Sequence, residues 1–126
     1  MSKFAWLILA LLWAPLTTFA ETPQADPALQ KTFEKMLAAI KDGDRDAFVA
    51  DGSEAVKKGT TAQVIKVLKD TVGGRLQSGY TATYLCSLKQ AGHQVNLWKL
   101  SFKDDDDDLV VRIAMKDGKV GGFFFQ

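Results

Sequence analysis

The chain has 126 residues, with 16 lysines and arginines against 15 aspartates and glutamates. This length excludes a multidomain enzyme, and the near balance of charge gives no electrostatic reason to bind nucleic acid or an anionic membrane. A single cysteine excludes an internal disulfide, so we expect the hydrophobic core to hold the fold.

The first twenty residues are typical of a secretory signal peptide. Lys3 precedes an uncharged apolar run over residues 4–14, Pro15 interrupts that run, and Thr18 and Ala20 are small residues where a signal peptidase would cut. The run is shorter than the roughly 20 apolar residues that a membrane-spanning helix needs. We therefore expect cleavage after Ala20, export to the periplasm or beyond, and no membrane attachment of the mature chain. An uncleaved anchor is the alternative.

Residues 21–26 are predicted to be a short polar linker, followed by a single domain over residues 27–126. Asp26 and Pro27 begin its first helix, because aspartate accepts hydrogen bonds from the free N–H groups of a first turn and proline fits the first helical position. Gly43 ends this helix, since glycine adopts the left-handed conformation beyond a last turn. The apolar residues between these ends recur with helical spacing and predict one buried face. They are Leu29, Phe33, Met36, Leu37 and Ile40.

Shorter helical segments are predicted next. Asp44 begins a second, short helix, and residues 53–58 are compatible with a further turn or two. A third helix is predicted from Thr60 to the pair Gly73-Gly74, where two glycines end it.

From Tyr80 onward the apolar residues alternate with a period of two, which is typical of strands. Turn signals divide this region into four strands joined by hairpins, so we expect an antiparallel meander. One face of the first strand is expected to carry Tyr80, Ala82, Tyr84, Cys86 and Leu88. One face of the second strand is expected to carry Asn96, Trp98, Leu100 and Phe102. Because helices come first and strands follow, the fold class is α+β, with three N-terminal helices packed on one face of a four-stranded antiparallel sheet.

Three features, taken in their order along the chain, carry a resemblance to a known fold. They are the turn 41–44 before a short second helix, Gly79-Tyr80 at the entry to the first strand, and the closing hairpin 117–123. Together they resemble the cystatin-like α+β roll of the nuclear-transport-factor-2-like superfamily, and most of all its small exported bacterial members of undescribed function. The resemblance implies a curved sheet wrapped around a long helix as a cone, often with a ligand pocket at the open end. Members of the superfamily include isomerases, cyclases and dehydratases, and many members only bind or dimerise.

The candidate pocket residues are side chains expected to face the interior of the cone: Phe33, Met36, Tyr84 and Trp98. Tyr84 and Trp98 each combine a large apolar body with one polar group, which suits a ligand pocket, and plain core packing is the alternative. Enzymes of the superfamily, such as ketosteroid isomerase, resemble each other in having carboxylates or histidines inside the cone. No aspartate, glutamate or histidine of this sequence is placed there, so we assign no catalytic residue.

Neither a metal nor a cofactor is expected. Asp104–Asp108 are five adjacent aspartates that point in different directions instead of converging on a calcium ion, so a solvated turn is predicted. His93 is the sole histidine and is expected in a turn, without partners at a recognisable zinc spacing. Cys86 is expected to be a small buried hydrophobe, because no cation or helix start is predicted beside it to stabilise a thiolate.

The sheet face opposite the helices is also predicted to be apolar. Its members are expected to be Leu85, Val95, Leu97 and Val110, with one or two of the phenylalanines 123–125. So much apolar surface usually needs a partner, and we expect a homodimer packed sheet to sheet. The protein is accordingly expected to be a non-enzymatic ligand-binding or protein-assembly module that accepts a small apolar molecule. The alternatives are a small enzyme of the isomerase or cyclase type that uses the pocket, and a structural accessory of a cell-envelope partner.

Overall fold

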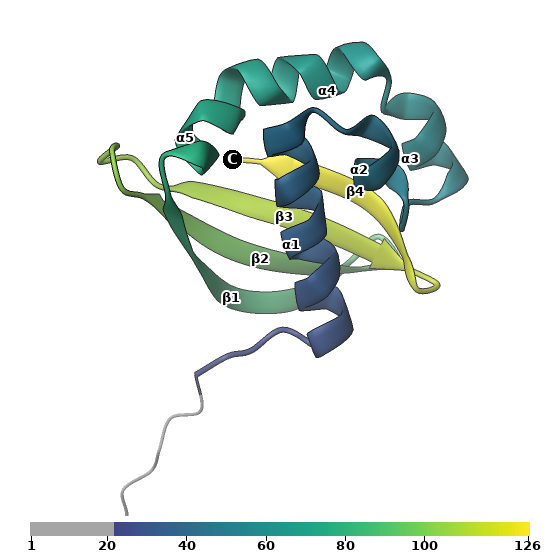
Figure 1. Ribbon diagram of the computed structural model, residues 1–126. Coiled ribbons are helices and arrows are strands. Elements are labelled where there is room, and N and C mark those ends of the chain that lie inside the picture. The colour runs from purple at the N-terminus through teal and green to yellow at the C-terminus, as the bar shows by residue number, and fades with distance from the viewer. Residues whose placement is uncertain (1–21) are drawn as a thin grey trace, which may run out of the picture.

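The computed structural model describes residues 22–126, and the predicted signal peptide lies outside the described residues. Helices occupy the first half of this range, and four antiparallel strands occupy the second half in a curved sheet (Figure 1). The predicted α+β class and the predicted meander are therefore confirmed. Among the described residues, no helix is both long enough and apolar enough to cross a membrane.

The longest helix is α1, Pro27–Asp42, and both of its predicted ends are confirmed. At its start, a carboxylate oxygen of Asp26 accepts a hydrogen bond from the Ala28 N–H at 3.2 Å. At its end, Gly43 has a φ of 68°, in the left-handed region that favours glycine. The helix buries the face that its spacing predicts, including Phe33 and Ile40, and places that face against the sheet.

The remaining helical segments are more numerous than the two that we predicted after α1. They are α2 (Arg45–Val49), α3 (Glu54–Gly59), α4 (Ala62–Leu68), a π-helical turn η1 (Lys69–Gly73) and α5 (Gly74–Gln77). The prediction that Gly73-Gly74 ends the third helix is wrong, because both glycines keep right-handed helical angles and the helix continues into α5. Gly73 serves close packing instead. A Cβ placed on it would lie 3.2 Å from the Lys69 side chain.

The helices do not all cover the sheet, so the prediction that three helices pack on one face is only partly correct. We call the face of the sheet toward α1 the concave face and the opposite one the outer face. Helix α1 lies across the concave face, and α2, η1 and α5 pack against α1 (Figure 1). Helix α3 contacts the last strand, where the Asp51 carbonyl accepts from the Val120 N–H at 2.8 Å and the Ser53 N–H donates to the Val120 carbonyl at 2.9 Å.

The sheet consists of β1 (Tyr80–Gln90), β2 (His93–Phe102), β3 (Leu109–Lys116) and β4 (Lys119–Phe125), in that spatial order. Two of its hairpins turn through pairs of residues with positive φ, Ala91-Gly92 and Asp117-Gly118. Such pairs are typical of tight turns whose twist matches that of the strands they join.

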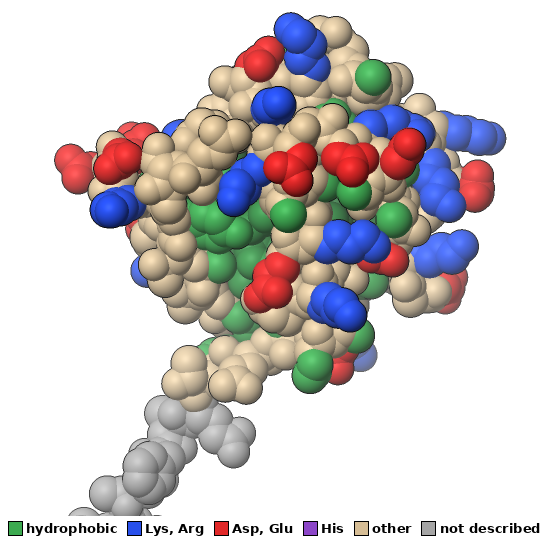
Figure 2. All heavy atoms as spheres, in the orientation of Figure 1, with side chains coloured by type: hydrophobic (Ala, Val, Ile, Leu, Met, Phe, Trp, Pro, Cys, Tyr) green, Lys and Arg blue, Asp and Glu red, His purple; other side chains and the backbone are tan. Residues whose placement is uncertain are grey.

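The core joins α1 to the middle of β2. The ring of Phe33 stacks on that of Trp98, with centroids 4.2 Å apart and planes 2° apart. The indole N–H of Trp98 donates to the Gln30 side-chain oxygen at 3.1 Å, so its one polar group is satisfied inside the protein. Figure 2 shows apolar side chains gathered in the hollow between α1 and the strands, with charged side chains on the surrounding helices.

Strand β1 contains an extra residue that the sequence pattern did not predict. Tyr84 pairs with Trp98, whereas Cys86 pairs with Leu97, so Leu85 has no partner of its own and forms a β-bulge. Each residue after the bulge therefore points to the face opposite the one that strict alternation predicts.

The bulge overturns two predictions. Cys86 and Leu88 lie on the outer face with Leu97 and Val95, not beside Tyr84. Cys86 is exposed, so the prediction that it is a buried hydrophobe is wrong.

The outer face carries the apolar side chains expected from the sequence, together with those that the bulge adds. Its members are Cys86, Leu88, Val95, Leu97, Val110, Ala114 and Phe124. Phe124 is 51% exposed, and the bulged Leu85 is 38% exposed. Phe123 and Phe125 pair with Ile113 and Val111, and so lie on the concave face.

Candidate functional site

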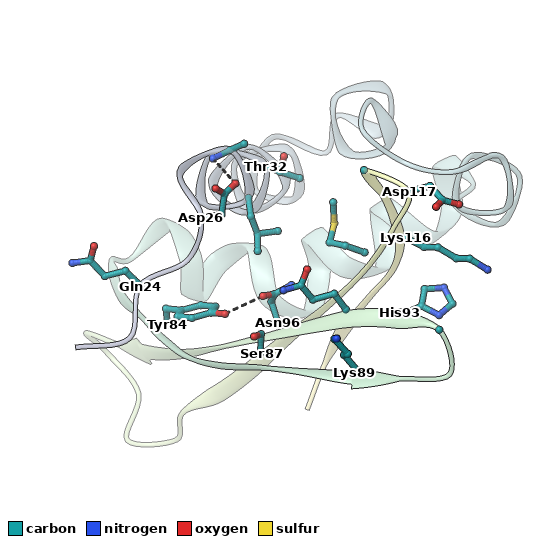
Figure 3. Close-up of a pocket in the computed structure, with 16 residues that line it drawn as sticks. Gln24, Asp26, Thr32, Tyr84, Ser87, Lys89, His93, Asn96, Lys116 and Asp117 are labelled. Atoms are coloured by element: carbon teal, nitrogen blue, oxygen red, sulfur yellow. Dashed lines mark hydrogen bonds between the residues drawn. The ribbon is translucent and has the colours of Figure 1, made fainter. Parts of the chain in front are cut away.

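A cavity of about 900 Å³ opens between the N-terminal half of α1 and one end of the concave face (Figure 3). Helix α1 contributes Leu29 and Thr32 to its wall, and β3 contributes Met115. The hairpin of β1 and β2 supplies the polar floor. These floor residues are Tyr84, Ser87, Lys89, Gln94 and Asn96.

The floor is polar because of the β1 bulge. Beyond the bulge, Ser87 pairs with Asn96 and Lys89 pairs with Gln94, all on the concave face. If the same sequence paired without a bulge, strict alternation would place Cys86 and Leu88 there instead. The bulge thus brings two polar side chains, in place of two apolar ones, to this end of the concave face.

Asn96 is the buried polar centre of the cavity wall. It is 1% exposed, and its Oδ1 accepts a hydrogen bond of 2.9 Å from the Tyr84 hydroxyl. The edge of the Tyr84 ring packs on Trp98, with centroids 5.3 Å apart and planes at 68°, and this contact aims the hydroxyl at Asn96 (Figure 3).

The Asn96 amide also carries an unmatched donor. Among the described residues, Asn96 Nδ2 has no hydrogen-bond acceptor. Leaving a buried donor unsatisfied costs about 1–3 kcal/mol, so most buried polar groups in native proteins have partners. Because Asn96 lines the cavity, a ligand acceptor that reaches Nδ2 would supply the missing partner.

The four sequence-predicted pocket residues do not meet in one place. Tyr84 lines the cavity. Phe33, Met36 and Trp98 are at most 1% exposed and belong to the packed core. Tyr84 adjoins the core group through Trp98, its partner across β1 and β2, with which its ring makes an edge contact.

Sequence reasoning missed Asn96 and Ser87 as site residues. The sequence pattern could have identified Asn96, because it is the one polar residue in an alternating series with the apolar Trp98, Leu100 and Phe102. Such a residue on a buried face needs a partner, and that need marks a site. Ser87 had no comparable signal, because its position on the concave face depends on the bulge.

The ionisable side chains that line the cavity are all exposed or half-buried. They are Asp26, Tyr84, Lys89, His93, Lys116 and Asp117. The Asp26 carboxylate caps α1, and His93 Nδ1 lies 3.0 Å from the Ala91 carbonyl oxygen. The buried part of the lining therefore offers hydrogen bonding and apolar contact without a charge.

The fold perturbs the ionisation of Tyr80. Burial raises the pKa of its phenol, and the negative charge of Glu34 raises it further. Tyr80 stands at the opposite end of β1 from the cavity floor and is not among the lining residues.

The aspartate loop is held by Arg75 from α5. The guanidinium donates to the Asp107 carbonyl at 2.8 Å, its Nε lies 3.1 Å from Asp105 Oδ2, and it sits 4.1 Å over the Phe102 ring. All five residues of Asp104–Asp108 are exposed. Within residues 22–126, no three histidine, cysteine, aspartate or glutamate side chains come together as metal ligands.

Comparison with known proteins adds one structural likeness. No protein-family model matches the chain, and no curated protein matches it. Among solved structures, the chain is similar to an uncharacterized cystatin-fold protein from Novosphingobium aromaticivorans, at 15% sequence identity over 76% of this chain and 95% of that chain, with a TM-score of 0.43. A likeness at this level carries no conclusion about family, ligand or activity.

Proposed function

We propose that the protein is an exported, non-enzymatic binding module that takes a small molecule into the cavity between α1 and the β1–β2 hairpin. The observation that carries the proposal is the buried, unpaired Nδ2 of Asn96 beside the Tyr84 hydroxyl. Export rests on the leader-like sequence of residues 1–20, and membership of the nuclear-transport-factor-2-like superfamily rests on the order of motifs along the chain.

The size and lining of the cavity support binding. Its volume of about 900 Å³ falls in the range of roughly 300–1,000 Å³ that is usual for small-molecule pockets. Leu29 and Met115 line it with apolar side chains, while Asn96 and Tyr84 form a hydrogen-bonded polar pair in its lining. Apolar walls with a few placed polar groups are the usual composition of a ligand site.

Binding is favoured over catalysis by the kind of polar group that is buried. A general acid or base acts through a titratable side chain held within hydrogen-bond reach of the substrate. In this cavity the buried polar group is an amide, which does not titrate.

A screen by nuclear magnetic resonance tests the proposal. We would titrate ¹⁵N-labelled protein, purified after expression of the full chain, with neutral and charged compounds of about 10–20 non-hydrogen atoms. The expected result is saturable shifts confined to Tyr84, Ser87, Asn96 and their neighbours. Ser87→Trp should block these shifts, because it fills the cavity from an exposed position, and Thr81→Ala on the outer face should leave them unchanged. Shifts that map elsewhere, or that Ser87→Trp leaves intact, would contradict the proposal.

We also propose that the outer face pairs with the outer face of a second copy. Exposed Phe124 and Leu85 support this, since they are apolar side chains open to solvent on β4 and β1 of the outer face, on which Arg112 also lies. Light scattering at tens of micromolar is expected to give the mass of a dimer, and Phe124→Lys is expected to give that of a monomer. A monomeric mass for the unaltered protein would refute the pairing.

A further inference from the structure

We infer that the cavity selects an uncharged molecule with a carbonyl group. The carbonyl end of this molecule enters the cavity ahead of the rest, and its oxygen accepts a hydrogen bond from Asn96 Nδ2. This inference rests on the proposed function and names the chemical class of its ligand. It follows from three features of the cavity: which hydrogen-bonding groups of the Tyr84–Asn96 pair are already used, where the charges lie, and where the apolar wall begins.

The free group at the buried end is a donor. The Tyr84 hydroxyl donates its proton to Asn96 Oδ1 at 2.9 Å, so the acceptor side of the amide already has a partner. An asparagine amide has two N–H groups, and among the described residues neither finds an acceptor. A ligand group that only donates, such as an ammonium, therefore leaves this mismatch in place, whereas a carbonyl oxygen removes it.

The charges of the site disfavour an anionic head group. Asn96 is 1% exposed, while Lys89 and Lys116, the cations of the lining, are exposed side chains. A carboxylate pushed against Asn96 would lose its water and gain an amide in place of a counter-ion, which costs far more than burying a neutral carbonyl. A charged group is accommodated only at the mouth of the cavity, beside Lys89 or Lys116.

The wall requires an apolar body behind the carbonyl. Leu29 from α1 and Met115 from β3 both line the cavity and are half-buried, so each has apolar surface left to cover. A flat or branched hydrocarbon group fits against these side chains, and its burial adds roughly 25 cal/mol per Å² of apolar surface removed from water. The ligand class is thus a neutral ketone, ester or amide with a hydrocarbon body.

Three probes with one naphthalene body separate the head groups: 2-acetylnaphthalene is a neutral ketone, 2-ethylnaphthalene is apolar and 2-naphthoate is an anion. We expect the ketone to bind roughly tenfold more tightly than 2-ethylnaphthalene, which is the usual worth of one good hydrogen bond to a buried group, and naphthoate to bind most weakly. The side-chain NH₂ signals of Asn96 should move with the ketone and stay in place with the other two probes.

The double variant Asn96→Leu with Tyr84→Phe supplies the matched control. It removes the Asn96 donor together with the Tyr84 hydroxyl, which would lose its acceptor and become free to donate to the ketone, so the ketone and 2-ethylnaphthalene should then bind equally. Thr81→Ala on the outer face should preserve the preference for the ketone. If the double variant fails to fold, the response of the Asn96 NH₂ signals in the unaltered protein decides between the head groups.

The outcomes distinguish the ligand class from the function. Binding of naphthoate or 2-ethylnaphthalene in the cavity as tightly as the ketone would overturn the inference and leave the binding module standing. Failure of all three probes to enter the cavity would overturn the inference, and if the wider screen also found no cavity ligand, the proposed function would fall as well.

Discussion

The two ends of the concave face differ although the same strands build both. At one end Trp98, Leu100 and Phe102 of β2 lie under α1 and α5 and are at most 8% exposed. At the other end Tyr84 and Asn96 border a cavity. Strand β2 alternates without interruption through both ends, so the change from packed core to open cavity does not originate in β2.

The change originates in β1, where the Leu85 bulge inverts the alternation. On one side of the bulge β1 sends Tyr80 and Ala82 to the concave face, and on the other side it sends Ser87 and Lys89. The comparison teaches that a bulge can reverse the alternation within a strand, so that its polar residues face a site, with no change in the strand that pairs with it.

The largest effect expected from this comparison is on the packed end. Trp98→Ala removes a fully buried ring that stacks on Phe33 and accounts for the hydrogen bond to Gln30. We expect the free energy of unfolding to fall by about 3–5 kcal/mol, as measured by urea denaturation. Ser87→Ala at the cavity end is the counterpart and should change it by less than about 0.5 kcal/mol. Similar losses for both variants would mean that the two ends are equally packed.

A smaller effect is expected when the bulge is removed. Deleting Leu85 leaves Tyr84 opposite Trp98 and Cys86 opposite Leu97, so every other side chain of β1 keeps its face. The stability loss should be about 1 kcal/mol, and the Cys86 thiol should react with a thiol reagent as rapidly as in the unaltered protein, because it stays exposed. If β1 were a regular strand, the deletion would move Cys86 to the other face and its reactivity would change sharply.

The smallest expected effect concerns the pH dependence of stability that Tyr80 contributes. It tests how far the Tyr80 phenol, at the end of β1 away from the cavity, is shielded from water. Its folded-state pKa lies above the ordinary value of 10.0 because the side chain is partly buried and near Glu34. A raised pKa means that the folded chain holds the phenolic proton more tightly, so this contribution is present in full below pH 10 and is lost as the pH rises through the folded pKa. The unfolding free energy of the unaltered protein should therefore decline relative to Tyr80→Phe above about pH 10. A constant difference from about pH 8 to about pH 11 would show that Tyr80 is solvated.

Much of the fold was predictable because it depends on local chemistry. The ends of α1 follow from Asp26, Pro27 and Gly43, and the closing turn follows from Asp117-Gly118, whose positive φ values suit that pair. The helix count was not predictable in the same way. Glycine permits a helix end without requiring one, and the packing of η1 and α5 against α1 is tertiary.

The candidate site was less predictable than the fold. Tyr84 was identified from its mixed polar and apolar character, and it does line the cavity. Which side chains join it depends on the register of β1. Tyr80, Ala82, Tyr84, Cys86 and Leu88 form an alternating apolar series, and the apolar Leu85 is its one irregularity, which an apolar outer face explains as well as a bulge does. The residue types of β1 do not reveal which of its residues pair with β2, so this part of the site needed the structure.

The burial of Trp98 gives the protein an optical reporter. The chain has three tryptophans, two of which belong to the predicted leader, so the mature protein would carry Trp98 alone. Its indole is shielded from water and its ring contacts Tyr84, whose hydroxyl side faces the cavity. The intrinsic fluorescence of the mature chain would then come from one known place, one side chain away from the cavity, and its emission would report occupancy without any attached dye.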